Sequence, residues 1–145
     1  MQNRVILLAE DEISDVDAMR AAFEQLGVRH PLRVVHDGEE VLSYLTGEGR
    51  YANRVEHPFP SMLILDLKMP KKTGWEVLDW LRATPQMEDL FVVVMTSCGQ
   101  TEQAQQTFEF YGKVCVFSCY LLKPVTIESV DMLIRFYESW LFSRK

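Results

Sequence analysis

Short runs of apolar residues alternate along the chain with stretches in which apolar residues recur every three or four positions. Five runs are apolar almost throughout, which is typical of strands buried on both faces: Val5–Ala9, Leu32–Val35, Met62–Leu65, Phe91–Met95 and Cys119–Leu122. Each run is followed by a stretch with the periodicity of a helix. The repeated order of strand and helix predicts an α/β fold, flavodoxin-like and doubly wound, with a five-stranded parallel sheet.

The limits of the helices are predicted from their capping residues. Ser14 is the expected N-cap of the first helix, and Gly27 stands where a C-cap glycine belongs. The other helices are expected after the turn at residues 37–38, over about 73–83, over about 101–111, and after a cap at Thr126. Residues 46–61 show no clear periodicity and contain two glycines and two prolines, so we expect a long surface loop there.

Length and composition predict a globular protein. The 145 residues are 48% hydrophobic, which suits one core, so we expect a single domain over residues 1–145, without an output domain. The net charge of −6 and the lack of a long basic run argue against binding to nucleic acid or an anionic membrane surface. The first apolar run is far too short for a membrane span or a signal peptide, so we expect a cytoplasmic protein.

Polar residues follow the ends of four predicted strands. Glu10 and Asp11 follow the first strand, Asp66 the third, Thr96 the fourth and Lys123 the fifth. Because the carboxyl ends of parallel strands lie at one edge of a sheet, these side chains are expected to converge. Clustered carboxylates repel unless a cation neutralises them, and their hard oxygen atoms suit Mg²⁺. A carboxylate can also attack phosphorus to give an aspartyl phosphate, whose charge a lysine and a hydroxyl would help to neutralise.

Four short strings of sequence resemble the receiver domain of two-component response regulators. They are Leu8-Ala9-Glu10-Asp11, Leu63-Ile64-Leu65-Asp66-Leu67-Lys68-Met69-Pro70 with Gly74, Met95-Thr96-Ser97 and Lys123-Pro124. Each string alone is modest, but their order and their places at strand ends make the combination specific. The loop of residues 46–61 and the segment after Asp66 look most like single-domain regulators associated with bacterial and cyanobacterial phytochromes.

The resemblance implies a phosphorylation site with a metal ion. Asp66 would be the phosphoacceptor, and Mg²⁺ would be held by Glu10, Asp11, Asp66 and the backbone carbonyl of Lys68. Glu10 is an aspartate in many members of the family, and we expect its extra methylene to be tolerated. The other acidic residues nearby, which are Glu12, Asp15 and Asp17, are expected to form a solvated helix start rather than further metal ligands.

The resemblance also implies a switch around the phosphoryl group. Thr96 would supply the hydroxyl that moves toward the phosphoryl group, and Lys123 would pair with one of its oxygen atoms. Tyr120 matches the aromatic residue that changes rotamer on activation. The Lys123–Pro124 peptide bond is expected to be cis, although most bonds before proline are trans.

Three other functions fit the same fold less well. A Mg²⁺-dependent aspartyl-phosphate phosphatase of the HAD-like kind would need an acid two residues after the nucleophile, where this chain has Lys68. A nucleotide or flavin binder would need a glycine-rich phosphate loop after the first strand, which is acidic here. A degenerate receiver that acts only as a docking module would have lost Asp66, Thr96 or Lys123, and all three are present.

The sequence therefore predicts a stand-alone response regulator, a signalling switch rather than a turnover enzyme. Its expected partners are a sensor histidine kinase, with the phytochrome type as the favoured kind, and a downstream target or phosphotransfer protein. A homodimer is also expected, because the last helix carries a second apolar ridge besides the one that faces the sheet. This ridge is formed by Met132, Phe136 and Trp140.

Overall fold

The computed structural model describes residues 4–97 and 117–143, and its centre is a parallel sheet. The strand order is β2-β1-β3-β4-β5, with every neighbouring pair parallel. The strands are β1 (Ile6–Ala9), β2 (Leu32–Val35), β3 (Met62–Asp66), β4 (Phe91–Ser97) and β5 (Phe117–Lys123). The predicted flavodoxin-like fold with five parallel strands is therefore confirmed.

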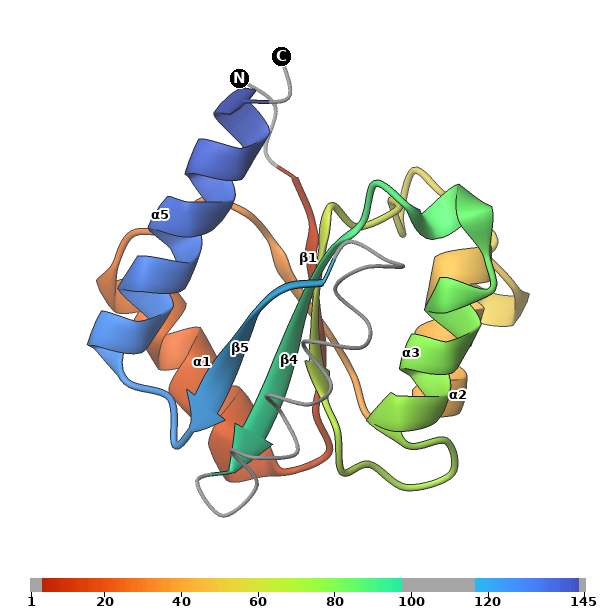
Figure 1. The fold of residues 1–145 in the computed structure, drawn as a ribbon, viewed down its shortest axis with the longest axis horizontal. Helices are drawn as coiled ribbons and strands as arrows, with labels where there is room; N and C mark the ends of the chain where they lie inside the picture. Colours follow the sequence, from red (N-terminus) through yellow and green to blue (C-terminus); the bar gives the residue numbers. More distant parts are fainter. Residues whose placement is uncertain (1–3, 98–116, 144–145) are drawn as a thin grey trace.

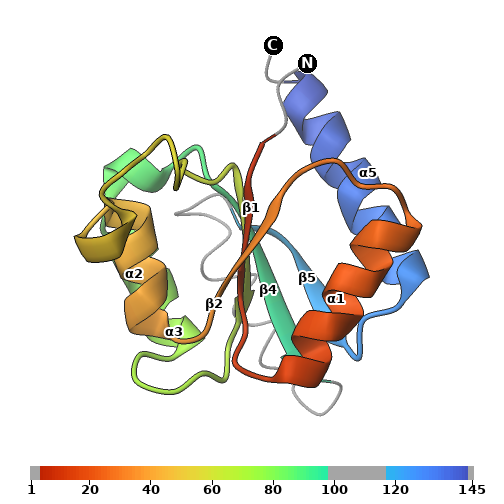
Figure 2. The same ribbon diagram turned by 180° about the vertical axis from the view of Figure 1, so that it is seen from behind.

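Helices cover both faces of the sheet, as Figures 1 and 2 show from opposite sides. One face carries α1 (Ile13–Gln25) and α5 (Ile127–Ser143), and the other carries α2 (Gly38–Thr46) and α3 (Gly74–Arg82). Two single-turn 3₁₀ helices, η1 (Gly49–Tyr51) and η2 (Pro85–Met87), lie in the connections. The helix predicted over residues 101–111 lies outside the described residues.

The alternation of side chains along each strand builds two separate cores. In β1, Leu7 and Ala9 belong to the cluster under α2 and α3, whereas Ile6 and Leu8 belong to the cluster under α1 and α5. All four residues are fully buried. Because both faces of the sheet are covered, the strands read in the sequence as uninterrupted apolar runs.

The predicted starts of three helices are confirmed, but the N-cap at Ser14 is wrong. The side chain of Asp37 accepts a hydrogen bond from the Glu40 N–H, and Thr73 forms a capping box with Glu76. Thr126 Oγ1 accepts a hydrogen bond from the Ser129 N–H at the start of α5. In contrast, α1 begins at Ile13 with Glu12 in the N-cap position, and no side chain caps it. The helix therefore begins two residues before the start that a cap at Ser14 would give.

Three strands, β3, β4 and β5, are longer than their apolar runs. The ladder between β4 and β5 continues through the pairs Thr96–Leu122 and Ser97–Lys123, so the polar residues at these ends are still strand residues. The Lys123–Pro124 bond that follows is cis, as predicted. Thr96 and Lys123 are thus placed by the sheet itself rather than by loops.

The loop after α2 is anchored to that helix through Glu40. Its carboxylate accepts a hydrogen bond from the Tyr51 hydroxyl at 2.7 Å and one from the His36 N–H at 2.7 Å, and it pairs with Arg50. Burial by itself would raise the pKa of Glu40, but these partners outweigh burial and lower it. The segment predicted as a surface loop therefore contains the buried residue Tyr51.

Among the described residues, none of the helices combines the length and the apolar character needed to cross a bilayer.

Candidate functional site

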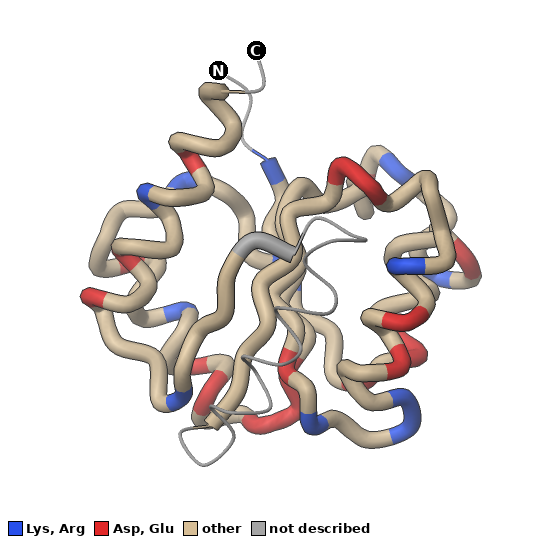
Figure 3. Tube along the Cα trace, in the orientation of Figure 1, with Lys and Arg blue, Asp and Glu red and all other residues tan. Residues whose placement is uncertain are grey.

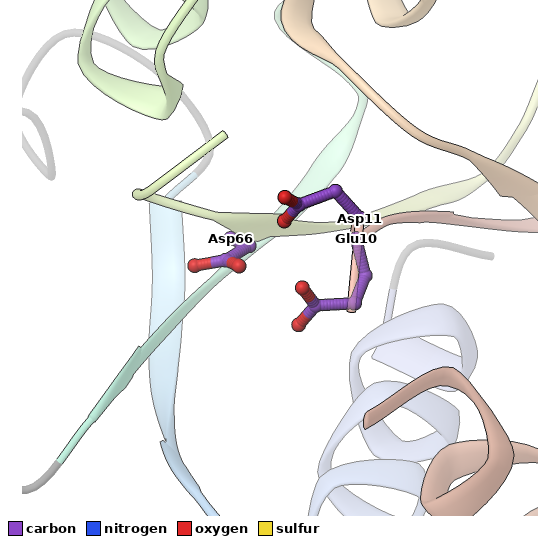
Figure 4. A group of neighbouring side chains, drawn as sticks. All are labelled: Glu10, Asp11 and Asp66. Carbon is purple, nitrogen blue, oxygen red and sulfur yellow. The ribbon is translucent and has the colours of Figure 1, made fainter. Parts of the chain in front are cut away.

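Three carboxylates meet at the carboxyl edge of the sheet. The register between β1 and β3 pairs Ala9 with Leu65, so the residues that come next, Glu10 and Asp66, lie side by side. Figure 4 shows Glu10 and Asp11 at the end of β1 and Asp66 at the end of β3, with their carboxylates around a common space. One oxygen atom from each of the three residues lies within 4.8 Å of the others. Acidic positions gather along this edge of the sheet in Figure 3.

Lys123 brings a positive charge into this group from the end of β5. Its Nζ lies 2.8 Å from Asp66 Oδ2 and 2.5 Å from Glu10 Oε1. Burial alone would lower the pKa of Lys123, but the hydrogen bond to Asp66 and the ion pair with Glu10 outweigh burial and raise it. The ammonium group therefore stays charged and partly balances the two buried carboxylates.

Glu10 is the most buried of the three acids. Its side chain is fully enclosed, and burial raises the pKa of Glu10 from an ordinary 4.5 to about 8, with a further increase from the Asp66 carboxylate. The nearby Lys123 ammonium group and the hydrogen bond from the Glu12 N–H act in the opposite direction. Burial beside a second carboxylate therefore disfavours the charged form of Glu10, and nearby positive charge favours it.

The loop between β3 and α3 orients the Asp66 side chain. The N–H of Lys68 donates to Asp66 Oδ1 at 3.1 Å, while the side chain of Lys68 itself is exposed. Both oxygen atoms of Asp66 are thus held, one by the loop and one by Lys123. Gly74 allows α3 to begin close against this loop, since a Cβ there would lie 2.6 Å from both the Asp66 carbonyl oxygen and Leu67 Cα.

Thr96 and Tyr120 lie on the neighbouring strands. Thr96 is buried on β4, one residue beyond Met95, the partner of Asp66 in the ladder, and its hydroxyl donates to the Ser97 carbonyl at 3.4 Å. Tyr120 lies on the edge strand β5 with 40% of its surface exposed. The Thr96 hydroxyl therefore lies on the strand next to Asp66, and the Tyr120 ring is partly exposed to solvent.

Asp15 contacts Lys123, and sequence reasoning missed this contact. Its Oδ2 lies 3.2 Å from Lys123 Nζ, and only 27% of its side chain is exposed. Asp15 does lie at a helix start and outside the carboxylate cluster, as predicted, but the prediction that it is solvated is wrong. Asp15 lies in the first turn of α1 and not at a strand end, so the pattern that identified the other residues carried no signal for it.

The apolar ridge predicted from the sequence, formed by Met132, Phe136 and Trp140, lies on α5 and is separate from the carboxylate cluster. Met132 is 72% exposed and Phe136 is 51% exposed, so both present apolar surface to solvent. Trp140 is half-buried, with its ring 5.0 Å from that of Phe91 and stacked on Tyr137. The exposed part of the ridge is thus formed by Met132 and Phe136.

Comparisons with known proteins identify the family. The response regulator Rcp1 of Synechocystis sp. is 30% identical over 139 residues, which cover 95% of this chain and 89% of Rcp1. Two solved structures are also similar. The bacteriophytochrome response regulator RtBRR has a TM-score of 0.80 and 32% identity over 92% of this chain and 77% of its own. The phosphorylated cyanobacterial phytochrome response regulator RcpA has a TM-score of 0.74 and 28% identity over 99% and 97% of the two chains.

The family model for the response regulator receiver domain matches residues 6–135, which span all five strands and reach into the last helix. The relatives are signalling proteins of the same family. The chain therefore belongs to the response regulator receiver domain family and is a response regulator of phosphorylation-based signalling.

Proposed function

We propose that Asp66 accepts a phosphoryl group from the phosphohistidine of a sensor histidine kinase. The observation that carries this proposal is the arrangement around Asp66: its carboxylate is held by Lys123 Nζ at 2.8 Å and by the Lys68 N–H at 3.1 Å. Glu10 and Asp11 lie beside it. An oriented carboxylate next to positive charge is suited to attack a phosphorus atom.

The transfer forms one bond and breaks one. A carboxylate oxygen of Asp66 binds phosphorus as the bond from phosphorus to the imidazole nitrogen of the donor breaks, and that nitrogen keeps the electron pair. The three phosphoryl oxygens bring negative charge to an edge that already has three carboxylates. Positive charge at this edge therefore decides whether the reaction proceeds.

The carboxylate cluster fits Mg²⁺. Its donors are hard oxygen atoms within 4.8 Å of one another, and the buried Glu10 beside Asp66 is in surroundings that favour a cation. We assign the ion to Glu10, Asp11, Asp66 and the backbone carbonyl of Lys68. When bound, Mg²⁺ supplies charge neutralisation for the phosphoryl oxygens. A structure of the relative Rcp1, which is 28% identical with a TM-score of 0.74, is a Mn²⁺-bound form.

Lys123, Thr96 and Tyr120 then respond to the phosphoryl group. The Lys123 ammonium group, already at Asp66 Oδ2, pairs with a phosphoryl oxygen. The Thr96 hydroxyl, on the strand next to Asp66, turns from the Ser97 carbonyl toward the phosphoryl group. Tyr120 changes rotamer as Thr96 moves, and its partly exposed position on the edge strand gives it room to do so.

The partners follow from this chemistry. The donor is a histidine kinase, and the similarity to RtBRR and RcpA supports a kinase of the phytochrome type. A histidine kinase uses ATP as its source of the phosphoryl group, and the need to meet such a kinase supports a cytoplasmic location. Output goes to a downstream protein or a phosphotransfer protein, and residues 1–145 act as one receiver domain that switches rather than turns over a substrate. A second copy of the chain would cover Met132 and Phe136 on α5.

The phosphatase alternative is disfavoured by the loop after Asp66. A phosphatase that works through an aspartyl phosphate needs a general acid close to the nucleophile. Position 68 carries a lysine whose side chain is exposed and whose backbone N–H is used to orient Asp66. The absence of an acid at position 68 supports the proposal that Asp66 is an acceptor that keeps the phosphoryl group.

Intact-mass measurement after incubation with acetyl phosphate and Mg²⁺ tests the proposal. The parent protein should gain about 80 Da, the mass of one phosphoryl group in acylphosphate chemistry, and Asp66→Asn should gain nothing. Omission of Mg²⁺ should slow the gain strongly. If Asp66→Asn labels as well as the parent, the assignment of the phosphoacceptor is wrong.

A further inference from the structure

Among the residues that the structure describes, three carboxylates contact the ammonium group of Lys123, and only two of them belong to the carboxylate cluster. Glu10 Oε1 and Asp66 Oδ2 lie at 2.5 and 2.8 Å, and Asp15 Oδ2 lies at 3.2 Å. The group of described residues that could share a metal ion contains Glu10, Asp11 and Asp66 but not Asp15. We infer that Asp15 is a positioning residue that aims the Lys123 ammonium group at the phosphoryl group, an inference that rests on the proposed function of Asp66.

The geometry of an ammonium group explains why a third contact matters. Lysine carries its ammonium group at the end of a flexible four-carbon chain, so each ion pair restricts where that group can lie. The three carboxylates come from three elements: the end of β1, the end of β3 and the first turn of α1. The ion pairs therefore link the ammonium group to three different parts of the fold.

The support that Asp15 offers is rigid. The N–H groups of Asp15 and Val16 both bond to the Glu12 carbonyl, at 3.1 and 3.0 Å, so the first turn of α1 is already formed around Asp15. Lys123 is itself largely enclosed, with 15% of its side chain exposed. Because Asp15 is held in place by its helix, its carboxylate can fix the position of the Lys123 ammonium group.

The other two contacts must change during phosphorylation, whereas the one to Asp15 need not. Glu10 and Asp66 are both assigned to the metal ion, and Asp66 also receives the phosphoryl group. The carboxylate oxygen atoms of Glu10 and Asp66 would then also contact the metal ion, and no longer Lys123 alone. Asp15 stands outside that donor group, so its contact with Lys123 can persist while a phosphoryl oxygen takes the place of Asp66 Oδ2.

The test compares Asp15→Ala and Asp15→Asn with Asp17→Ala, which removes an equal charge from an exposed position of the same helix. Uptake from acetyl phosphate is followed by intact mass over a range of Mg²⁺ concentrations. Asp15→Ala should slow uptake at saturating Mg²⁺ by about tenfold, since small errors in placement have large effects on rate. The Mg²⁺ concentration for half-maximal rate should not change. Asp15→Asn, which keeps an oxygen acceptor, should recover most of the rate, and Asp17→Ala should match the parent.

A double-mutant cycle separates positioning from a general effect on the fold. In a Lys123→Ala background the Asp15→Ala substitution should have no further effect on uptake. In the metal-free proteins, the shifts in the urea midpoint for the two substitutions should be non-additive, a readout that needs no phosphoryl transfer. Uptake by Asp15→Ala at the parent rate or faster, or an equal slowing in the Lys123→Ala background, would overturn the inference while leaving Asp66 as the acceptor. A parent protein that takes up no phosphoryl group would overturn the proposed function, and this inference with it.

Discussion

Replacement of Gly74 by alanine should disturb both the fold and the site, because helix α3 begins in direct contact with the loop that carries Asp66. The added Cβ would lie 2.6 Å from the Asp66 carbonyl oxygen, 2.6 Å from Leu67 Cα and 3.2 Å from the Asp66 carbonyl carbon. All three are backbone atoms, so no side-chain rotation can relieve the contact. Either the start of α3 or the backbone at residues 66–67 has to move.

The size of the effect follows from two opposing contributions. Overpacking of a well-packed interior costs about 1–3 kcal/mol, and alanine in place of glycine in a helix gains at most about 1 kcal/mol. Gly74→Ala should therefore lower the free energy of unfolding by up to about 3 kcal/mol, with a central value of about 1–2 kcal/mol. Because the displaced backbone belongs to Asp66, the rate of phosphoryl uptake should fall by roughly tenfold or more.

A control variant separates lost stability from lost geometry. Gly27, at the end of α1, has a φ of 66°, and a Cβ added there would meet no atom within 4 Å outside its own neighbours in the chain. Gly27→Ala should therefore cost about 1–2 kcal/mol through backbone strain alone, with uptake unchanged. Urea unfolding followed by tryptophan fluorescence gives the stabilities, and intact mass gives the rates. Gly74→Ala with parent stability and parent uptake would refute the close approach of α3 to Asp66.

Three further predictions concern the metal site, the loop anchor and the last helix. Asp11→Ala should weaken Mg²⁺ binding at least about tenfold in a titration followed by tryptophan fluorescence, whereas Asp17→Ala should not. If Asp11→Ala binds Mg²⁺ as tightly as the parent protein, Asp11 is not a metal ligand. The pKa of Glu40 is lowered in the folded state, so its contribution to stability is present above its ordinary pKa of 4.5 and is lost as the pH falls through the folded value. Glu40→Gln should thus be less stable than the parent by roughly 1 kcal/mol at pH 7. The two proteins should converge in unfolding experiments as the pH falls through the lowered pKa of Glu40, and a difference independent of pH would contradict this. Joint replacement of Met132 and Phe136 by serine should reduce the mass seen by light scattering without unfolding the domain, and a parent that stays monomeric at high concentration, with and without phosphodonor, would contradict the dimer.

The fold could be predicted because its signals are local in the sequence. A strand buried on both faces appears as an apolar run, and β1 and β3 show this clearly. The residues Asp37, Thr73 and Thr126 marked helix starts for the same reason, since each acts on the backbone of its own first turn. The parallel arrangement then brought Glu10, Asp66 and Lys123 to one edge.

The features that the sequence did not reveal depend on distance in space. Asp15 reads as an ordinary acidic residue at a helix start, and its contact with Lys123 exists only because α1 packs beside the end of β5. Gly74 belongs to the family motif, but its close contact with the Asp66 backbone is a matter of packing. Ser14 is not the N-cap of α1, because the helix begins at Ile13 with Glu12 in the N-cap position, two residues before Ser14.

The central claim is tested most directly by locating the phosphoryl group at the level of a single residue. The parent protein is phosphorylated with acetyl phosphate and Mg²⁺, treated with borohydride, which reduces an acyl phosphate to an alcohol, and digested for peptide mass spectrometry. We predict homoserine in place of aspartate at position 66, with the signal lost when Mg²⁺ is omitted and unmodified carboxylates at Glu10, Asp11 and Asp15. Reduction at one of those three residues, or none at Asp66 in protein that has gained the phosphoryl mass, would contradict the claim that Asp66 is the acceptor.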